Sequence, residues 1–257
     1  MRRPEYRSVL GVRVDATDYP DATRRIVEWA RQKRSCYVCC AAVNNIMEAR
    51  RSSDYRAAMD LADLVTSDGM PLVWMLRALG VPGASRVYGP DLTARVLEAA
   101  AQAGLPVGFY GGSKTVLARL LGVVQERFPG LQVAYAEAPP FRALTEDEDA
   151  RTTEAINQSG ARILFVGLGS PKQDRWMHQH KDHVQAVMLG VGAAFDFLAG
   201  AKAQAPRWMQ SSGLEWAFRL ATEPRRLWRR YLKQNPAFAV LALAQLARLR
   251  SGRMRAT

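Results

Sequence analysis

Short apolar runs alternate with longer helical patterns over the first 200 residues, and this alternation restricts the fold more than any other feature of the chain. The apolar runs predict strands at Val9–Val14, Tyr37–Ala41, Val107–Tyr110, Leu131–Ala136, Ile163–Val166 and Ala186–Leu189. The helical patterns fall between them, at residues 21–33, 54–62, 91–103, 114–127, 146–158 and 172–180. We therefore expect an α/β fold, with a Rossmann-like, mostly parallel sheet that carries helices on both faces. Ligands of such sheets bind beyond the carboxyl ends of the strands.

The pattern changes after about residue 200, where helical segments become rich in Arg and Trp. Prolines at Glu223-Pro224 and Asn235-Pro236 predict that one helix ends or bends and another begins. The sequence thus divides into an α/β domain, residues 1–200, and a helical basic appendage, residues 201–257. Residues 207–257 hold ten Arg and one Lys against two Glu, which supplies +9 of the net charge of +12. Such a tail predicts an anionic partner, either a membrane surface or nucleic acid.

The chain shows no pattern for export or for spanning a membrane. Its N-terminus lacks the apolar core of a signal peptide, and the most apolar stretch, Ala237 to Ala247, is shorter than the roughly 20 residues that a span needs. We expect a cytoplasmic protein and leave peripheral membrane association open. The three cysteines, Cys36, Cys39 and Cys40, lie in one strand-like run without a second cluster to complete a zinc site, so we interpret them as buried thiols.

Three glycine turns at strand ends predict a nucleotide pocket. The first contains Gly167 and Gly169 before a helix that begins near Pro171, where free N–H groups favour a diphosphate beside Lys172 and Gln173. An ordinary strand-to-helix turn explains this segment equally well. The second turn contains Gly111 and Gly112, and the third runs from Leu189 to Asp196. None has the dinucleotide fingerprint or a Walker loop, which argues against dehydrogenases and nucleoside triphosphatases.

Acidic residues are the candidates for a general base, because sugar transfer to a hydroxyl needs a proton acceptor. Asp68 follows a short apolar run, at what we expect to be a strand end, and a helix cap is its alternative role. The one Asp-x-Asp, residues 147–149, fits a capping box with Thr145 better than a metal site. We expect no bound metal and no cofactor. The histidines at 178, 180 and 183 are interpreted as a solvated helix end.

A departing nucleotide diphosphate needs positive charge, and without a metal arginine is the suitable group. The appendage offers Arg219, Arg225, Arg226, Arg229 and Arg230. The same arginines, with Trp216, Trp228 and Tyr231, are also suited to bind anionic lipid headgroups. A solvated basic face without a ligand is the remaining alternative.

At these residues the chain resembles the WecG/TagA/CpsF family of glycosyltransferases, from about Val9 to Phe238. The motifs that carry the resemblance are Thr66–Trp74, Arg86–Asp91, Gly111-Gly112, Pro139–Arg142, Gly167–Gln173, Gly190–Asp196, Ala205–Trp208, Gly213–Trp216 and Glu223–Arg226.

The resemblance implies an inverting, metal-independent transfer from a UDP-sugar donor to an undecaprenyl-diphosphate-linked sugar acceptor in bacterial teichoic acid, common-antigen or exopolysaccharide synthesis. It makes Asp68 the candidate base, places Gln173 at the nucleotide-sugar, and gives the appendage a role both in the site and at the inner face of the plasma membrane. Residues 1–200 would be the catalytic domain. The candidate binding residues are Asn44, Arg86, Tyr88, Gly89, Asp91, Gly111, Gly112, Gly167, Gly169, Pro171, Lys172, Gln173, Gly192, Phe195, Asp196, Arg207, Arg219, Arg225, Arg226 and Arg229.

The chain departs from the family pattern in two places. Ala42 stands where many relatives have Thr, and Asp174 follows Gln173 where relatives commonly have Glu. N-acetylmannosamine is therefore not assigned as the donor sugar. The alternative to a transferase is a basic membrane- or RNA-binding module. If the chain is a transferase of this family, we expect no nucleic acid partner. A nucleotide-sugar oxidoreductase would need the missing dinucleotide fingerprint. Exposed apolar surface on the appendage would serve lipid or a homo-oligomer interface.

Overall fold

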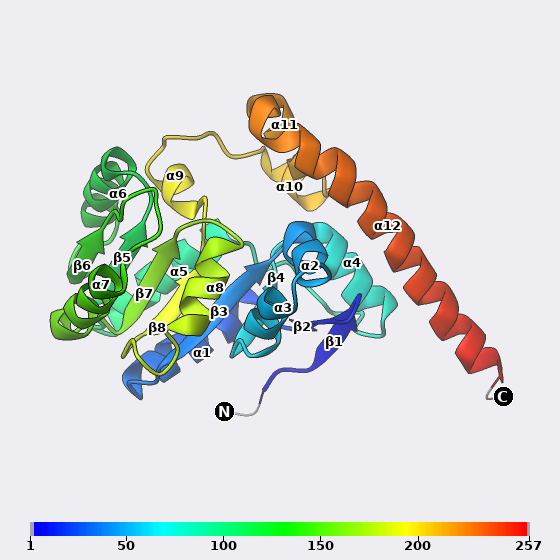
Figure 1. Cartoon of the computed structure of the whole chain (residues 1–257), viewed down its shortest axis with the longest axis horizontal. Coiled ribbons are helices and arrows are strands. Elements are labelled where there is room, and N and C mark those ends of the chain that lie inside the picture. Colours follow the sequence, from blue (N-terminus) through cyan, green and yellow to red (C-terminus); the bar gives the residue numbers. More distant parts are fainter. Residues whose placement is uncertain (1–2, 256–257) are drawn as a thin grey trace.

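The computed structural model describes residues 3–255, without the side chains of residues 250 and 252–255. Its centre is a sheet of six parallel strands in the order β4-β3-β8-β7-β5-β6 (Figure 1). The strands are β3 (Cys36–Ala41), β4 (Leu64–Ser67), β5 (Val107–Gly111), β6 (Val133–Glu137), β7 (Ile163–Gly167) and β8 (Val187–Gly190). The expected parallel α/β sheet is confirmed.

Helices cover both faces of the sheet because its strands bury side chains on both sides. In β7, Ile163 and Phe165 belong to one apolar core, whereas Leu164 and Val166 belong to the other. The first core is completed by α1 (Tyr19–Arg31), α5 (Gly89–Gln102), α6 (Lys114–Arg127) and α9 (Ala194–Leu198). The second is completed by α2 (Val43–Ala49), α3 (Ser53–Asp60), α4 (Met70–Ala78), α7 (Glu146–Ser159) and α8 (Lys172–Gln179). This two-residue alternation is the expected signature of a strand between two helical layers.

The single strand expected at Val9–Val14 is wrong. The segment forms an antiparallel hairpin of β1 (Tyr6–Val9) and β2 (Val12–Asp15). Leu10 and Gly11 both have positive φ angles, and a two-residue turn of this kind matches the twist of the paired strands. The Asp15 carboxylate accepts a hydrogen bond from the Val65 N–H at 2.7 Å, which ties the hairpin to β4.

The helices expected between the strands are confirmed, with ends that differ by at most two residues. Helix α2 was not expected; the Asn45 side chain stabilises its start by accepting a hydrogen bond from the Ala42 N–H. The capping box is confirmed, since Thr145 and Glu148 exchange hydrogen bonds. The solvated helix end is wrong for His180, which is buried and contacts the Asp149 carboxylate at 2.9 Å.

The cysteine interpretation holds for Cys36 and Cys39, which are free thiols buried on opposite faces of β3. Burial raises the pKa of the Cys36 thiol to about 12, so this group stays protonated at neutral pH. Cys40 is half-buried.

The C-terminal region consists of α10 (Arg207–Ser211), α11 (Glu215–Thr222) and α12 (Pro224–Arg255). Helix α12 begins at Pro224, as expected, but continues through Pro236 rather than ending there. It runs along one edge of the molecule, beyond the hairpin (Figure 1). Phe238 and Ala242 are buried against the second core, and Gln245 hydrogen-bonds the backbone of Ser8 and Leu10. Among the described residues, no helix combines the length and apolarity needed to cross a membrane.

Candidate active site

A cleft lies at the carboxyl ends of β3, β4, β7 and β8, where α11 and the first turns of α12 cover it. It consists of two adjoining hollows. The sheet-side hollow is lined by the loops after β7 and β8, including Gly169, Gln173 and Gly192. The appendage-side hollow is lined by α4, α11 and α12, including Trp216 and Tyr231. The residues that line both hollows are Ala42, Asn44, Asp68, Arg219 and Arg230.

Asp68 lies at the junction of the two hollows, directly after β4. Its backbone N–H donates to the Ala41 carbonyl at 2.8 Å, which continues the strand pairing and fixes the residue at the sheet edge. Its Oδ1 accepts a hydrogen bond from the Gly89 N–H at 2.6 Å. Burial, together with the nearby Glu215 carboxylate, raises the pKa of the Asp68 carboxyl to about 6, although Arg86, Gly89 and Arg219 act in the opposite direction. The group is therefore ionised at neutral pH, yet a much better proton acceptor than an ordinary Asp.

Arg86 connects the domain to the appendage. Its Nε donates to the Asp68 carbonyl, and its Nη2 donates to the Glu215 carboxylate of α11. The guanidinium also lies over the Tyr88 ring, 4.1 Å from the ring centre. Arg86 thus links α11 to the strand end that carries Asp68, and it also lines the appendage-side hollow.

The predicted binding glycines divide into two groups. A methyl group on Gly111 would lie 2.5 Å from the Gly167 backbone, and one on Gly167 would lie 2.6 Å from the Phe195 ring. These two glycines, together with the fully buried Phe195, are therefore needed for packing of the turns. Gly169 and Gly192 line the sheet-side hollow, where their lack of a side chain leaves room for a ligand.

Gln173 is buried at the start of α8 and lines the sheet-side hollow. Its Oε1 accepts a hydrogen bond from the Gly169 N–H at 3.0 Å. The Gly169 amide, expected to be free for a diphosphate, is therefore already engaged by a side chain. Pro171 caps α8 and does not line the hollow.

A third, outer hollow adjoins the sheet-side hollow and shares Gly169, Gly192 and Arg226 with it. The predicted residues Gly112, Gly167, Lys172 and Asp196 line it. Phe141, also in its wall, is 91% exposed. The arrangement combines a large aromatic ring with cations and one carboxylate.

The appendage arginines do not all face the cleft. Arg219 and Arg230 line both hollows, and the Nε atom of each is buried without a hydrogen-bond partner among the described residues. Arg226 lines the sheet-side and outer hollows and pairs with Glu223 at 2.7 Å. Arg225 and Arg229 are exposed and line neither of the two main hollows.

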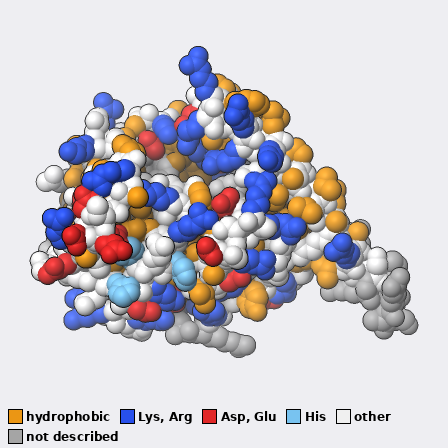
Figure 2. Space-filling model, viewed as in Figure 1, with side chains coloured by type: hydrophobic (Ala, Val, Ile, Leu, Met, Phe, Trp, Pro, Cys, Tyr) orange, Lys and Arg blue, Asp and Glu red, His pale blue; other side chains and the backbone are white. Residues whose placement is uncertain are grey.

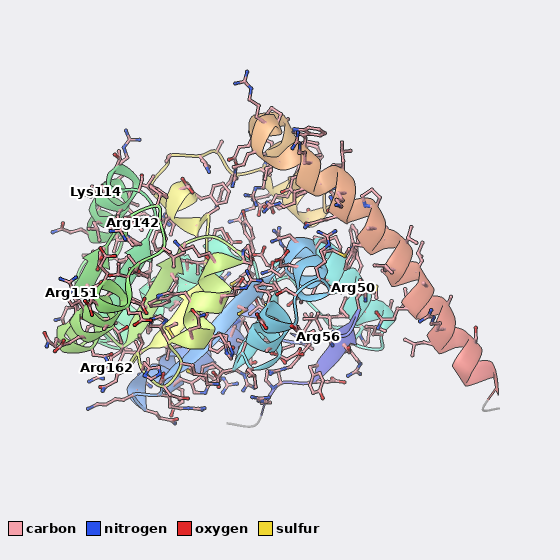
Figure 3. The ribbon with its side chains drawn as sticks, in the orientation of Figure 1. Arg50, Arg56, Lys114, Arg142, Arg151 and Arg162 are labelled. Carbon is pink, nitrogen blue, oxygen red and sulfur yellow. The ribbon has the colours of Figure 1, made fainter. Side chains whose placement is uncertain are left out.

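Other predicted residues lie outside the two main hollows. Arg207 pairs with Asp91 at 2.8 Å, and neither residue lines them. Cations also occur all around the molecule, as the labelled Arg50, Lys114, Arg151 and Arg162 of Figure 3 illustrate. Orientation toward the cleft, rather than charge alone, distinguishes Arg219 and Arg230.

Several lining residues were not predicted from the sequence. Tyr88 and Gly89 were expected, whereas Asn45, Ser170, Gln210, Glu215, Gln234 and Asn235 were not. Ser170 and Glu215 lie within motifs that carried the family resemblance, so closer attention to those motifs would have included them. Within the described part of the chain, no three His, Cys, Asp or Glu side chains are grouped so as to hold a metal ion.

Comparisons with known proteins identify the family of the chain. The model of the Glycosyl transferase WecG/TagA/CpsF family matches residues 7–252. The chain is also similar to the N-acetylglucosaminyldiphosphoundecaprenol N-acetyl-beta-D-mannosaminyltransferase of Bacillus spizizenii, with 33% identity over 204 residues, which cover 78% of this chain and 76% of the relative. The match includes both the sheet and the appendage that covers the cleft, and the chain therefore belongs to the WecG/TagA/CpsF family of glycosyltransferases.

Proposed function

We propose that this glycosyltransferase moves a sugar from a UDP-sugar to N-acetylglucosamine linked to a polyprenyl diphosphate, with inversion and without a metal ion. The observation that carries the proposal is the position of Asp68, which lines both hollows together with Arg219 and Arg230, two arginines whose buried Nε atoms have no hydrogen-bond partner among the described residues. The relative from Bacillus spizizenii is named for a lipid-diphosphate-linked N-acetylglucosamine acceptor, which supports the acceptor class.

Asp68 acts as the general base in this proposal. Its carboxylate takes the proton of the acceptor hydroxyl while the hydroxyl oxygen bonds to the anomeric carbon of the donor. The bond from that carbon to the diphosphate oxygen breaks at the same time, and UDP leaves with the electron pair. Attack from the side opposite UDP inverts the configuration in one step.

The donor occupies the sheet-side hollow. Gln173 and Gly192 line its inner wall, and Arg219 and Arg230 face them from the appendage. Guanidinium groups remain charged and donate two hydrogen bonds to phosphate, so they offset the charge that develops on the leaving diphosphate. Their unpartnered Nε atoms support this role, because buried donors are otherwise satisfied within the protein.

The acceptor sugar occupies the appendage-side hollow, with its lipid directed along α12. Trp216 and Tyr231 line this hollow, and aromatic rings suit the apolar faces of sugars and the boundary of a membrane. The donor and acceptor thus meet at Asp68.

Peripheral membrane association follows from the surface of α12. Its outer side exposes Trp228, Leu232, Val240 and Leu243, each at least 45% accessible. Figure 2 shows hydrophobic side chains along this helix, with Lys and Arg gathered at its start and around the adjoining hollow. An apolar strip beside clustered arginines is the pattern of a helix that lies in an anionic membrane surface. A second copy of the chain is the competing occupant of this strip.

The test of the proposed reaction is Asp68→Asn, assayed as UDP release from UDP-sugars with a short-chain lipid-diphosphate N-acetylglucosamine acceptor. Asparagine keeps the hydrogen bond from Gly89 but cannot accept the proton. Turnover should fall at least ~100-fold, the scale of lost general-base assistance, while UDP binding stays near that of the native protein. Turnover close to the native value would refute Asp68 as the base.

Two controls address the finer points. Panels of UDP-hexoses and UDP-N-acetylhexosamines identify the donor sugar. That sugar is left open because Ala42 stands where many relatives have Thr. Product stereochemistry tests inversion, and native activity in excess chelator tests metal independence.

A further inference from the structure

A buried carboxylate lies beneath the cleft, and no Lys or Arg pairs with it in the described part of the chain. Asp174 on α8 is fully buried. Its Oδ2 accepts hydrogen bonds from the Tyr55 hydroxyl at 2.6 Å and from the Asn45 amide at 3.3 Å. Its Oδ1 has no hydrogen-bond partner among the residues that the structure describes. Burial raises the pKa of this carboxyl, which the surrounding donors oppose.

The hydrogen bonds around Asp174 join two loops of the cleft. The Asn45 amide also donates to the Ser170 hydroxyl at 2.9 Å, and the Tyr55 and Ser170 hydroxyls are 3.1 Å apart. Asn45 in turn accepts from the Ala42 N–H at 3.0 Å. One connected set of bonds therefore links the start of α2, after β3, to the turn after β7.

These two loops carry opposite sides of the proposed reaction. The turn after β7 carries Gly169 and Gln173 in the sheet-side hollow, whereas Ala42 and Asn44 lie at the junction with Asp68. The Asp68 and Gly69 amides both lie within hydrogen-bond reach of the Ala41 carbonyl. Strand β8 separates β3 from β7 in the sheet, so no direct strand pairing sets the spacing of the two loops.

Burying a carboxylate without a paired cation costs more free energy than filling the same space with an apolar side chain. Desolvation of a charged group costs several kcal/mol, and well-packed apolar side chains often replace buried ionic groups without loss of stability. Packing alone therefore does not explain Asp174. A carboxylate can, however, accept several directed hydrogen bonds at once, which an apolar side chain cannot.

We propose that Asp174 is a positioning residue for sugar transfer, because its hydrogen bonds to Tyr55 and Asn45 set the spacing between the loop that holds the donor and the loop beside Asp68. The inference rests on the proposed function in naming the donor and the base. In this proposal Asp174 itself contacts neither the donor nor the acceptor.

This role predicts a particular kinetic effect. The donor contacts on the turn after β7 remain when the link is broken, so the KM for the donor should change little. The alignment of the donor with Asp68 is lost, so kcat should fall, and displacements near 1 Å can cost about 100-fold in rate. A role in stability alone lowers the unfolding temperature but leaves kcat unchanged in the folded protein.

The test is Tyr55→Phe, with Tyr37→Phe as the matched control. Both tyrosines are fully buried, and each variant loses a hydrogen-bonded phenolic hydroxyl. The Tyr37 hydroxyl donates to the Ala58 carbonyl and lies 3.2 Å from the His178 Nδ1, outside the link between the loops. Neither residue lines the cleft. We expect kcat to fall about tenfold or more in Tyr55→Phe with donor KM within about threefold, and native kcat in Tyr37→Phe. Asp174→Leu, which removes both acceptor oxygens at a similar side-chain volume, should resemble Tyr55→Phe in kcat and in hydrogen exchange.

A second readout needs no activity. Hydrogen exchange of the unliganded protein should be faster in Tyr55→Phe at both residues 42–47 and residues 168–173, and at neither segment in Tyr37→Phe. Native kcat in folded Tyr55→Phe, or faster exchange in one loop only, overturns the positioning role. If the native protein releases no UDP with any donor, the proposed function fails, while the exchange experiment still decides whether Asp174 couples the two loops.

Discussion

Asp68 combines two properties that are rarely found together in one carboxyl group. It lines both hollows, yet burial and the neighbouring Glu215 carboxylate raise its pKa to about 6. A base with a pKa close to the working pH accepts protons most effectively while it is still ionised. Holding the ionised carboxylate in this buried position lowers the stability of the folded protein.

The pH dependence of turnover should report this group. Because the base must be ionised, kcat should be constant above about pH 7 and fall about tenfold for each unit below about pH 6. The measurement is UDP release between pH 5 and pH 8 with saturating donor and acceptor. A profile that stays flat down to pH 5 would mean that no group with this pKa takes the proton.

The stability of Asp68→Asn provides the matching control. The folded-state pKa of about 6 lies above the ordinary value of 3.8, so ionisation of Asp68 destabilises the folded state as pH rises through this window. Asparagine should therefore stabilise the protein by about 3 kcal/mol at pH 8 and by almost nothing below pH 4. Urea unfolding at the two pH values measures the difference.

Among the helices, α11 and the first turns of α12 decide which arginines reach the cleft. Arg219 and Arg230 point into both hollows, while Arg225 and Arg229 lie on the exposed side. Helix rotation sets this division, since residues three or four apart share a face and residues one or two apart do not. The ion pair between Arg86 and Glu215 holds the rotation in place.

Arg219→Ala and Arg230→Ala should each weaken UDP binding by about 10- to 100-fold, the range of a lost hydrogen bond to a charged group. Arg248→Ala is the control, because Arg248 is an exposed arginine on the same long helix that lines none of the three hollows. Calorimetric titration with UDP measures all three variants. Equal affinities in the cleft variants and the control would assign the diphosphate to other groups.

At the scale of the whole molecule, the cleft at the carboxyl ends of the strands lies beside the exposed amphipathic helix α12. Helix α12 is anchored through Phe238, Ala242 and Gln245, so its opposite side, with Val240 and Leu243, faces outward. A cleft that opens beside this surface allows an acceptor to enter while its lipid stays in the membrane. The appendage thus completes the pocket and presents the surface for lipid.

Vesicle binding tests this arrangement. Val240→Glu with Leu243→Glu should abolish flotation with anionic vesicles, because two exposed apolar side chains that would contact the membrane are replaced by charges that anionic lipid repels. Leu61→Glu, at an exposed leucine on another part of the molecule, should float like the native protein. Turnover with a short, water-soluble acceptor should be unaffected in all variants. A change in native molar mass without loss of flotation would instead assign the strip to a second copy.

The sequence by itself determined the features that depend on neighbouring residues. Short apolar runs identified five strands of the sheet, and the pattern from Thr145 to Glu148 identified a helix start, because strand burial and helix capping depend on residues within a few positions. Asp68 and Gln173 were recognised from motifs and do line the cleft.

Only the tertiary structure decided the rest. It turned Leu10-Gly11 into a hairpin, buried His180 against Asp149, gave Phe195 to the core, and selected Arg219 and Arg230 from five similar arginines. It also joined Asn45 to Asp174 across 129 positions of the chain. The physical reason is that a side chain's burial, pKa and partners depend on which surfaces pack against it, and those surfaces come from segments far away in the sequence.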